Sequence, residues 1–219
     1  MDLDFSPVLA DLPFILGGLT TTLTVVASSI LFGMVFGTLL ALMKLGKVKL
    51  LSGVATVYIS IFRGTPLMLQ LAFIYFALPL SFGIDLGSYG SAMLGMGLNS
   101  SAYIAEIIRS GISAVDKGQT EASLALGIPY PKMMRNIILP QALKNIFPAL
   151  INEFSVLVKE SAIVNVVALS DLMRRGMLIG ARSFRYFESL IVIGAIYYVA
   201  VMVIALIGTY VERGLAVSD

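Results

Sequence analysis

The stretch EASLALGIPYPKMMRNIILPQAL, residues 121–143, is the part of the sequence that most strongly indicates the fold. It contains one carboxylate, one glycine and three prolines, and long apolar runs lie on both sides of it. A polar stretch punctuated by proline between two apolar runs is typical of a segment that leaves the bilayer between two spans. The stretch therefore predicts a membrane protein that presents an ordered segment to water.

The local signals within this stretch predict two short helices joined by a turn. Thr120 is expected to cap a helix that begins at Glu121. Gly127 is expected to end that helix in a left-handed conformation. Pro131 then begins a second short helix, which Pro140 is expected to close. The result is a compact helical elbow.

The composition of the whole chain supports a polytopic membrane protein. Of 219 residues, 58% are hydrophobic and 13% are charged, against about 25% charged in soluble domains. The mean hydropathy is +0.94. The chain has no cysteine and no histidine, so we expect no disulfide, no metal site and no thiol nucleophile. A net charge of +2 is too small to indicate a nucleic-acid partner.

Five apolar runs are long enough to cross a bilayer, which takes about 20 residues. We therefore expect an all-α integral membrane protein with five spans in one domain, residues 1–219, and its two ends on opposite sides. The second run is interrupted at residues 63–66 by Arg-Gly-Thr-Pro, which predicts either an unwound break or a simple proline kink. The expected spans are 14–43, 50–80, 89–111, 142–167 and 190–210.

The positions of the lysines predict the orientation. Lysine and arginine are enriched in cytoplasmic loops, so an external N-terminus and a cytoplasmic C-terminus place most lysines correctly. Four arginines then fall on the wrong side, in the last external loop. Six of the seven lysines fit this orientation: Lys44, Lys47, Lys49, Lys117, Lys132 and Lys144. The four arginines that do not fit are Arg174, Arg175, Arg182 and Arg185.

The elbow closely resembles the EAA motif of ABC importer permeases. Glu121, Ala122, Gly127 and Pro140 match that motif, and Ser123 replaces its second alanine. The stretches 62–79, 101–112 and 158–172 also resemble the polar amino acid subfamily of these permeases, so the resemblance covers most of the chain.

The resemblance implies a type I ABC importer fold in a bacterial cytoplasmic membrane. Residues 114–140 would form the coupling segment that docks on an ATP-binding subunit, which carries ATP and Mg²⁺. The sequence contains no G-x-x-x-x-G-K-[ST] phosphate loop, so we expect a transport subunit without enzymatic activity. The implied partners are two ATP-binding subunits, a second copy or a paralogous permease, and an extracytoplasmic binding protein. The coupling residues would be Glu121, Ala122, Leu126, Gly127 and Pro129.

Glu153 is the candidate for substrate recognition. It lies near the middle of the fourth span, and charged side chains at this depth usually face a cavity or a partner. We expect Glu153 to bind the side chain of a cationic amino acid (arginine, lysine or histidine), although pairing with Arg63 or with another helix would also explain it.

The rest of the substrate would be held by the second and third spans. The broken region, with Gly64, Thr65 and Leu67, would bind the carboxylate. Asn99 and Tyr103 share a helical face and would orient the α-amino group, unless they only satisfy hydrogen bonds in the core. The alternative functions are a glutamine or glutamate permease of the same family and an ion-coupled secondary transporter.

Overall fold

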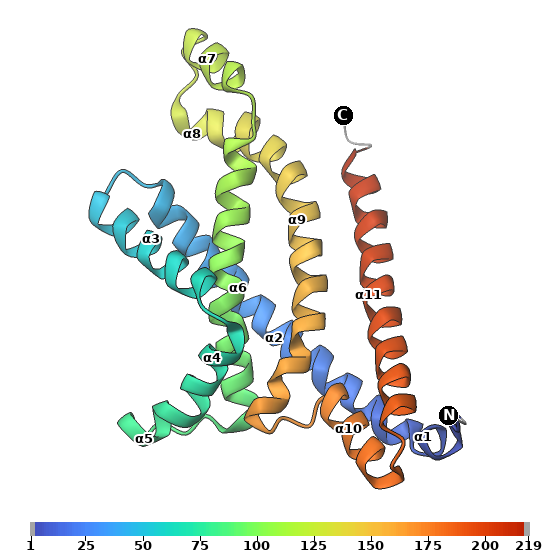
Figure 1. The fold of residues 1–219 in the computed structure, drawn as a ribbon. Coiled ribbons are helices and arrows are strands. Elements are labelled where there is room, and N and C mark those ends of the chain that lie inside the picture. The colour runs from blue at the N-terminus through green and yellow to red at the C-terminus, as the bar shows by residue number, and fades with distance from the viewer. Residues whose placement is uncertain (1–2, 217–219) are drawn as a thin grey trace.

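The chain is helical almost throughout the part that a computed structural model describes, residues 3–216 (Figure 1). No strand occurs within those residues. In chain order the elements are α1 Ser6–Ala10, α2 Leu12–Leu45, α3 Lys49–Gly64, α4 Leu67–Ala72, the π-helical η1 Phe73–Ala77, α5 Leu78–Phe82, α6 Gly87–Ser113, α7 Lys117–Ala125, α8 Tyr130–Met133, the π-helical η2 Met134–Ile138, α9 Leu139–Glu160, the 3₁₀-helical η3 Ser161–Val167, α10 Leu172–Ser183 and α11 Tyr186–Ala216.

Two of these helices, α2 and α11, are each long and apolar enough to cross a membrane. The second predicted span corresponds to a bent pair, which consists of α3 and the helical run that starts with α4. Counted as one span, this pair gives a third crossing. α6 and α9 have 27 and 22 residues, which is long enough at about 1.5 Å per residue, but they carry more polar side chains. The five-span arrangement therefore remains a prediction.

The fourth predicted span, 142–167, does not continue as one α-helix. α9 ends at Glu160, and residues Ser161–Val167 form a 3₁₀-helix that stops at Ala168, whose φ is +59°. The Ser161 hydroxyl donates to the Val158 carbonyl oxygen at 2.7 Å. A serine side chain that is hydrogen-bonded to a nearby carbonyl competes with the backbone hydrogen bonds of an α-helix. The spacing of apolar residues does not reveal this competition.

α2 packs closely along α6 because glycines face the contact. A β-carbon at Gly37 would lie 2.8 Å from the carbonyl oxygen of Ser101 on α6. A β-carbon at Gly33 would meet Ser100 at 3.3 Å. Small residues at such positions let helix backbones approach in lipid, where the hydrophobic effect does not drive association.

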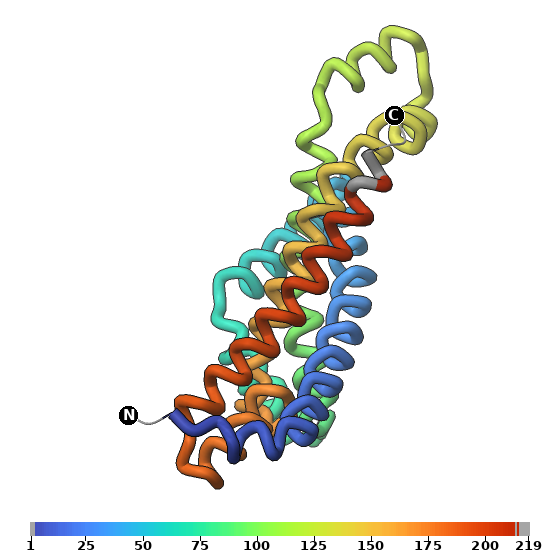
Figure 2. The backbone as a smooth tube through the Cα atoms, turned by 90° about the vertical axis from the view of Figure 1, so that its right-hand side faces the viewer, coloured from blue at the N-terminus to red at the C-terminus, as the bar shows by residue number. Residues whose placement is uncertain are grey.

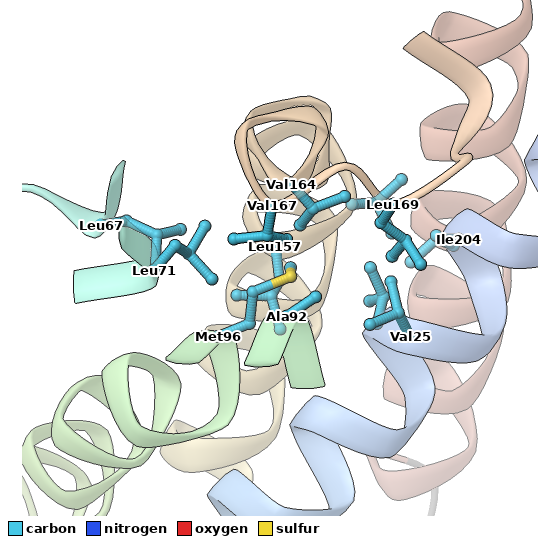
Figure 3. Packing of buried hydrophobic residues seen from close by; sticks show 12 residues of the cluster. Val25, Leu67, Leu71, Ala92, Met96, Leu157, Val164, Val167, Leu169 and Ile204 are labelled. Atoms are coloured by element: carbon cyan, nitrogen blue, oxygen red, sulfur yellow. The ribbon is translucent and has the colours of Figure 1, made fainter. Parts of the chain in front are cut away.

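The largest buried apolar cluster of the described residues forms where α2, α4, α6, α9, η3 and α11 meet (Figure 3). Val25 of α2, Met96 of α6 and Leu157 of α9 are fully buried in it. Ile204 of α11 joins the same cluster. This core fixes α6 against α9, which carry the polar residues of the candidate site.

The elbow and the far end of α11 lie at one end of the elongated molecule (Figures 1 and 2). α1, α5 and α10 lie at the opposite end. α10 was not predicted, and it is anchored there by Asp171, which accepts hydrogen bonds from the backbone N–H groups of Arg174 and Met173 at 2.9 and 3.2 Å. Burial raises the pKa of Asp171, and these hydrogen bonds partly oppose that effect.

Candidate functional site

The predicted break in the second span is real. α3 ends at Gly64 and α4 begins at Leu67, with Thr65 and Pro66 extended between them. The chain bends by 104° between the two arms of the bent pair. Proline has no N–H group and disfavours a helical conformation of the preceding residue, so the chain unwinds there instead of kinking within one continuous helix.

The carbonyl groups released by this break are satisfied by Gln70, a residue that we did not predict. Its Nε2 donates to the carbonyl oxygens of Phe62 and Thr65 at 2.9 and 3.1 Å, and to the Thr65 hydroxyl at 2.9 Å. Asn99 Nδ2 on α6 donates to the Phe62 carbonyl at 3.1 Å and to Gln70 Oε1 at 3.0 Å. A single glutamine among apolar residues was the sequence signal that could have indicated this role. Together, Gln70 and Asn99 hold the break against α6.

Glu153 lies in α9 against α6. Its side chain is 8% exposed, and Ser100 donates to its Oε1 at 3.0 Å. Ser100 was also missed by sequence reasoning. No lysine or arginine whose side chain the structure describes forms an ion pair with Glu153. Arg63 and Glu160 are the charged groups near enough to act on it electrostatically. The carboxylate therefore has a hydrogen-bond donor but no paired cation in the described chain.

The predicted face of the third span, which Glu106 extends by three residues beyond Tyr103, divides into three environments. Asn99 is directed at the break. Tyr103 is 37% exposed, and the guanidinium of Arg63 lies over its ring, 5.3 Å from the centroid. Glu106 binds Lys44 at 2.9 Å and Arg109 at 2.5 Å, so its carboxylate is already neutralised. Of the predicted substrate residues, only Asn99 and Thr65 are joined through a shared partner, Gln70.

The helical elbow has the predicted turn but different helix limits. α7 begins at Lys117, four residues before the predicted start, and its cap is Asp116, which accepts from the Gly118 N–H at 2.6 Å. Thr120 is therefore not the cap. An aspartate is as good a capping residue as threonine, and the polar residues 117–120 fit the first helical turn.

Gly127 ends this helix as predicted, with φ of +69°. The Gly127 N–H donates to the Leu124 carbonyl and the Ile128 N–H to the Ser123 carbonyl, both at 3.0 Å. This pair of bonds is a common way to close a helix whose last residue is left-handed. Pro129 then caps α8.

Pro140 does not close the second helix, contrary to our prediction. α8 passes through the π-helical η2 directly into α9, and the Leu139 N–H donates to the Met134 carbonyl five residues before it. A π-helical turn lets the helix continue through a proline, which provides no N–H group. The elbow thus continues through η2 into α9, the helix that carries Glu153.

Large apolar side chains on the elbow are exposed. Leu124, Leu126 and Tyr130 have 60%, 78% and 65% of their surface accessible, and Glu121 and Ala122 are also exposed. Three such exposed side chains on one short segment are suited to contact with another protein.

The comparisons with known proteins agree with this architecture. A family model described as "Binding-protein-dependent transport system inner membrane component" matches residues 33–217. The arginine transport system permease protein ArtQ of Bacillus subtilis is 49% identical over 219 residues, which is all of both chains. A putative glutamine transport system permease protein, GlnP of Rickettsia felis, is 45% identical over 205 residues, 94% of each chain.

A solved structure described as an amino acid ABC transporter with histidines is also similar. It has a TM-score of 0.92 and 43% sequence identity, and the match covers 97% of this chain and 99% of that one.

Proposed function

Because the chain belongs to the binding-protein-dependent transport system inner membrane component family, we propose that it carries cationic amino acids of the arginine type. The chain is a permease subunit of an ABC amino-acid importer, a transport subunit and not an enzyme. Of the two relatives above, one is named for arginine and one for glutamine.

The observation that carries the proposal is the carboxylate of Glu153. It is almost fully buried, it accepts a hydrogen bond from Ser100, and none of the cationic side chains that the structure describes is paired with it. A buried charge without a partner is costly. A substrate with a cationic side chain would supply the missing charge, whereas a neutral side chain would not.

The remainder of the substrate would lie between Glu153 and the break. We assign the carboxylate of the substrate to the region of Gly64, Thr65 and Leu67. Asn99 and Tyr103 would receive the α-ammonium. Both N–H contacts of Asn99 go to the break, and its Oδ1 accepts no hydrogen bond from residues 3–216. An acceptor oxygen suits an ammonium group.

The elbow would couple this site to ATP hydrolysis. Glu121, Ala122, Leu126, Gly127 and Pro129 would contact an ATP-binding subunit, which holds ATP and Mg²⁺. Since the elbow continues into α9 without a break in the helix, a push on the elbow would reach Glu153.

The complete transporter would contain two ATP-binding subunits and two permeases, either two copies of this chain or this chain with a paralogue. An extracytoplasmic binding protein would deliver the substrate. The chain would cross the membrane five times, with its N-terminus outside, and would alternate between inward-facing and outward-facing states.

The test is substrate binding to the solubilised transporter without its binding protein, for wild type and Glu153→Gln. This substitution keeps the shape and removes the charge. Loss of one partner of a buried charge pair costs on the order of 2–5 kcal/mol, so arginine should bind at least about 30-fold more weakly. Glutamine binding should change far less.

Glu106→Gln is the matched control, because it makes the same chemical change on a carboxylate that already has two cationic partners. It should affect arginine and glutamine equally. Equal losses for both substrates in Glu153→Gln would assign Glu153 a structural role. A wild-type transporter that prefers glutamine would refute the cationic proposal, and uptake driven by an ion gradient without the ATP-binding subunit would refute ATP-driven import.

A further inference from the structure

Four arginines lie at the end of the molecule opposite the elbow, on or next to α10 (Figure 1). They are the residues that the positive-inside rule left unexplained. Three of them have partners within the chain. Arg174 donates to the Asn165 carbonyl at 3.5 Å, Arg175 to the Ser170 and Phe14 carbonyls at 3.3 and 3.1 Å, and Arg185 to Glu188 at 3.3 Å.

Arg182 differs from the other three. It is exposed, and no residue of the described chain, 3–216, binds its guanidinium. Arg175 has only neutral partners, namely two carbonyl oxygens and the ring of Phe14, 5.0 Å from its guanidinium carbon. Neither guanidinium is paired with a carboxylate among those residues. Both therefore retain positive charge and unused N–H donors.

These two arginines lie on one face of α10. Arg175, Leu178 and Arg182 are spaced by three and four residues, which places them in one row along a helix. Leu178 is 39% exposed between them. We call these three residues the arginine stripe.

Exposed aromatic residues flank the arginine stripe. Phe14 of α2 is 38% exposed, and Phe184, at the turn between α10 and α11, is 89% exposed. Phe184 also has a φ of +56°, which is uncommon for a bulky residue. Phe14 and Phe184 therefore place exposed apolar rings beside the cationic groups of the arginine stripe.

The length of α11 places this turn at the level of the lipid headgroups. α11 has 31 residues, or about 45 Å at 1.5 Å per residue. That length matches a whole bilayer including both headgroup layers, about 40–45 Å. The uninterrupted apolar run starts only at Leu190, so the turn before Tyr186 lies at the boundary between the hydrocarbon layer and the headgroups, within reach of the phosphates.

We propose that the arginine stripe binds the phosphate of an anionic phospholipid, with Phe14 and Phe184 in contact with the upper part of its acyl chains. Planar guanidinium groups bind phosphate oxygens in pairs of hydrogen bonds. The lipid would hold α10 at the membrane surface. This inference does not depend on which amino acid the transporter carries.

The test measures lipid binding to the assembled transporter by native mass spectrometry, with phosphatidylglycerol and phosphatidylcholine in competition and no binding protein. Wild type should prefer phosphatidylglycerol. Arg182→Gln should weaken that preference about fivefold, since one arginine near an anionic surface contributes roughly that factor. Arg182→Lys should retain most of it. Arg135→Gln is the matched control, because it removes one exposed cation at the elbow.

A second measurement tests depth without altering an arginine. The chain has no cysteine, so Phe184→Cys, assembled with cysteine-free partners, carries a single nitroxide label. The label should be more accessible to oxygen than to a water-soluble nickel reagent. An unchanged lipid preference in Arg182→Gln, or a label that is fully accessible from water, would overturn the proposal. A loss of ATPase stimulation by the binding protein in Arg182→Gln, with lipid binding unchanged, would instead make this surface a docking site for that protein.

Discussion

Gly127→Val should uncouple the elbow while leaving the helix bundle intact. Gly127 has a φ of +69°, and a β-carbon there would meet no atom within 4 Å. The free-energy cost of Gly127→Val therefore comes from the backbone conformation and not from a clash with neighbouring residues. A residue with a β-carbon pays roughly 1–2 kcal/mol in this region, which lowers the population of the correct turn by a factor of about 5–30. The two hydrogen bonds that close α7 depend on this turn.

The assay is ATP hydrolysis stimulated by loaded binding protein in proteoliposomes, together with the affinity of the permease for the ATP-binding subunit. Both should fall in Gly127→Val, while the yield of inserted permease stays constant. Gly127→Asn should be much milder, because asparagine tolerates the left-handed region. Gly53→Ala is the control at an equally open glycine in a helix. Full coupling in Gly127→Val, or equal damage from asparagine and valine, would refute the reasoning.

Two further substitutions test the packing that positions the site. Gly37→Leu should lower thermal stability, because the new β-carbon would lie 2.8 Å from the Ser101 carbonyl oxygen. Overpacking of this kind typically costs about 1–3 kcal/mol. Gly194→Ala is the control, since a β-carbon there meets no atom within 4 Å, and its melting temperature should not fall. Gln70→Leu should also destabilise the protein, by about 1–3 kcal/mol, since it removes the donor to the Phe62 and Thr65 carbonyls; a melting temperature equal to that of wild type would contradict that role.

Local chemistry made several features predictable from the sequence. The left-handed turn at Gly127 follows from a glycine placed before Pro129 and Pro131. The break at 63–66 follows from Gly64 and Pro66, because proline acts on its own residue and on the one before it. The elbow and the helix limits near 14–43 and 89–111 rest on the same kind of short-range signal.

Other local predictions were wrong where two sequence signals competed. Asp116 and Thr120 are both good capping residues, and the sequence alone did not decide that the helix begins at Lys117. Pro140 predicts the end of a helix, but the π-helical turn η2 lets the helix continue through it. These choices depend on how the segment joins α9.

The sequence by itself determined that the chain is a helical membrane protein with an ordered elbow and a polar residue, Glu153, deep in an apolar run. The tertiary structure alone decided what each polar residue meets. Ser100 reaches Glu153 across 53 positions of sequence, and Asn99 reaches Gln70 across 29. Helical periodicity gives the face on which a side chain lies, but the partner on that face is set by the packing of α6 against α9 and the broken helix, which no short-range pattern encodes.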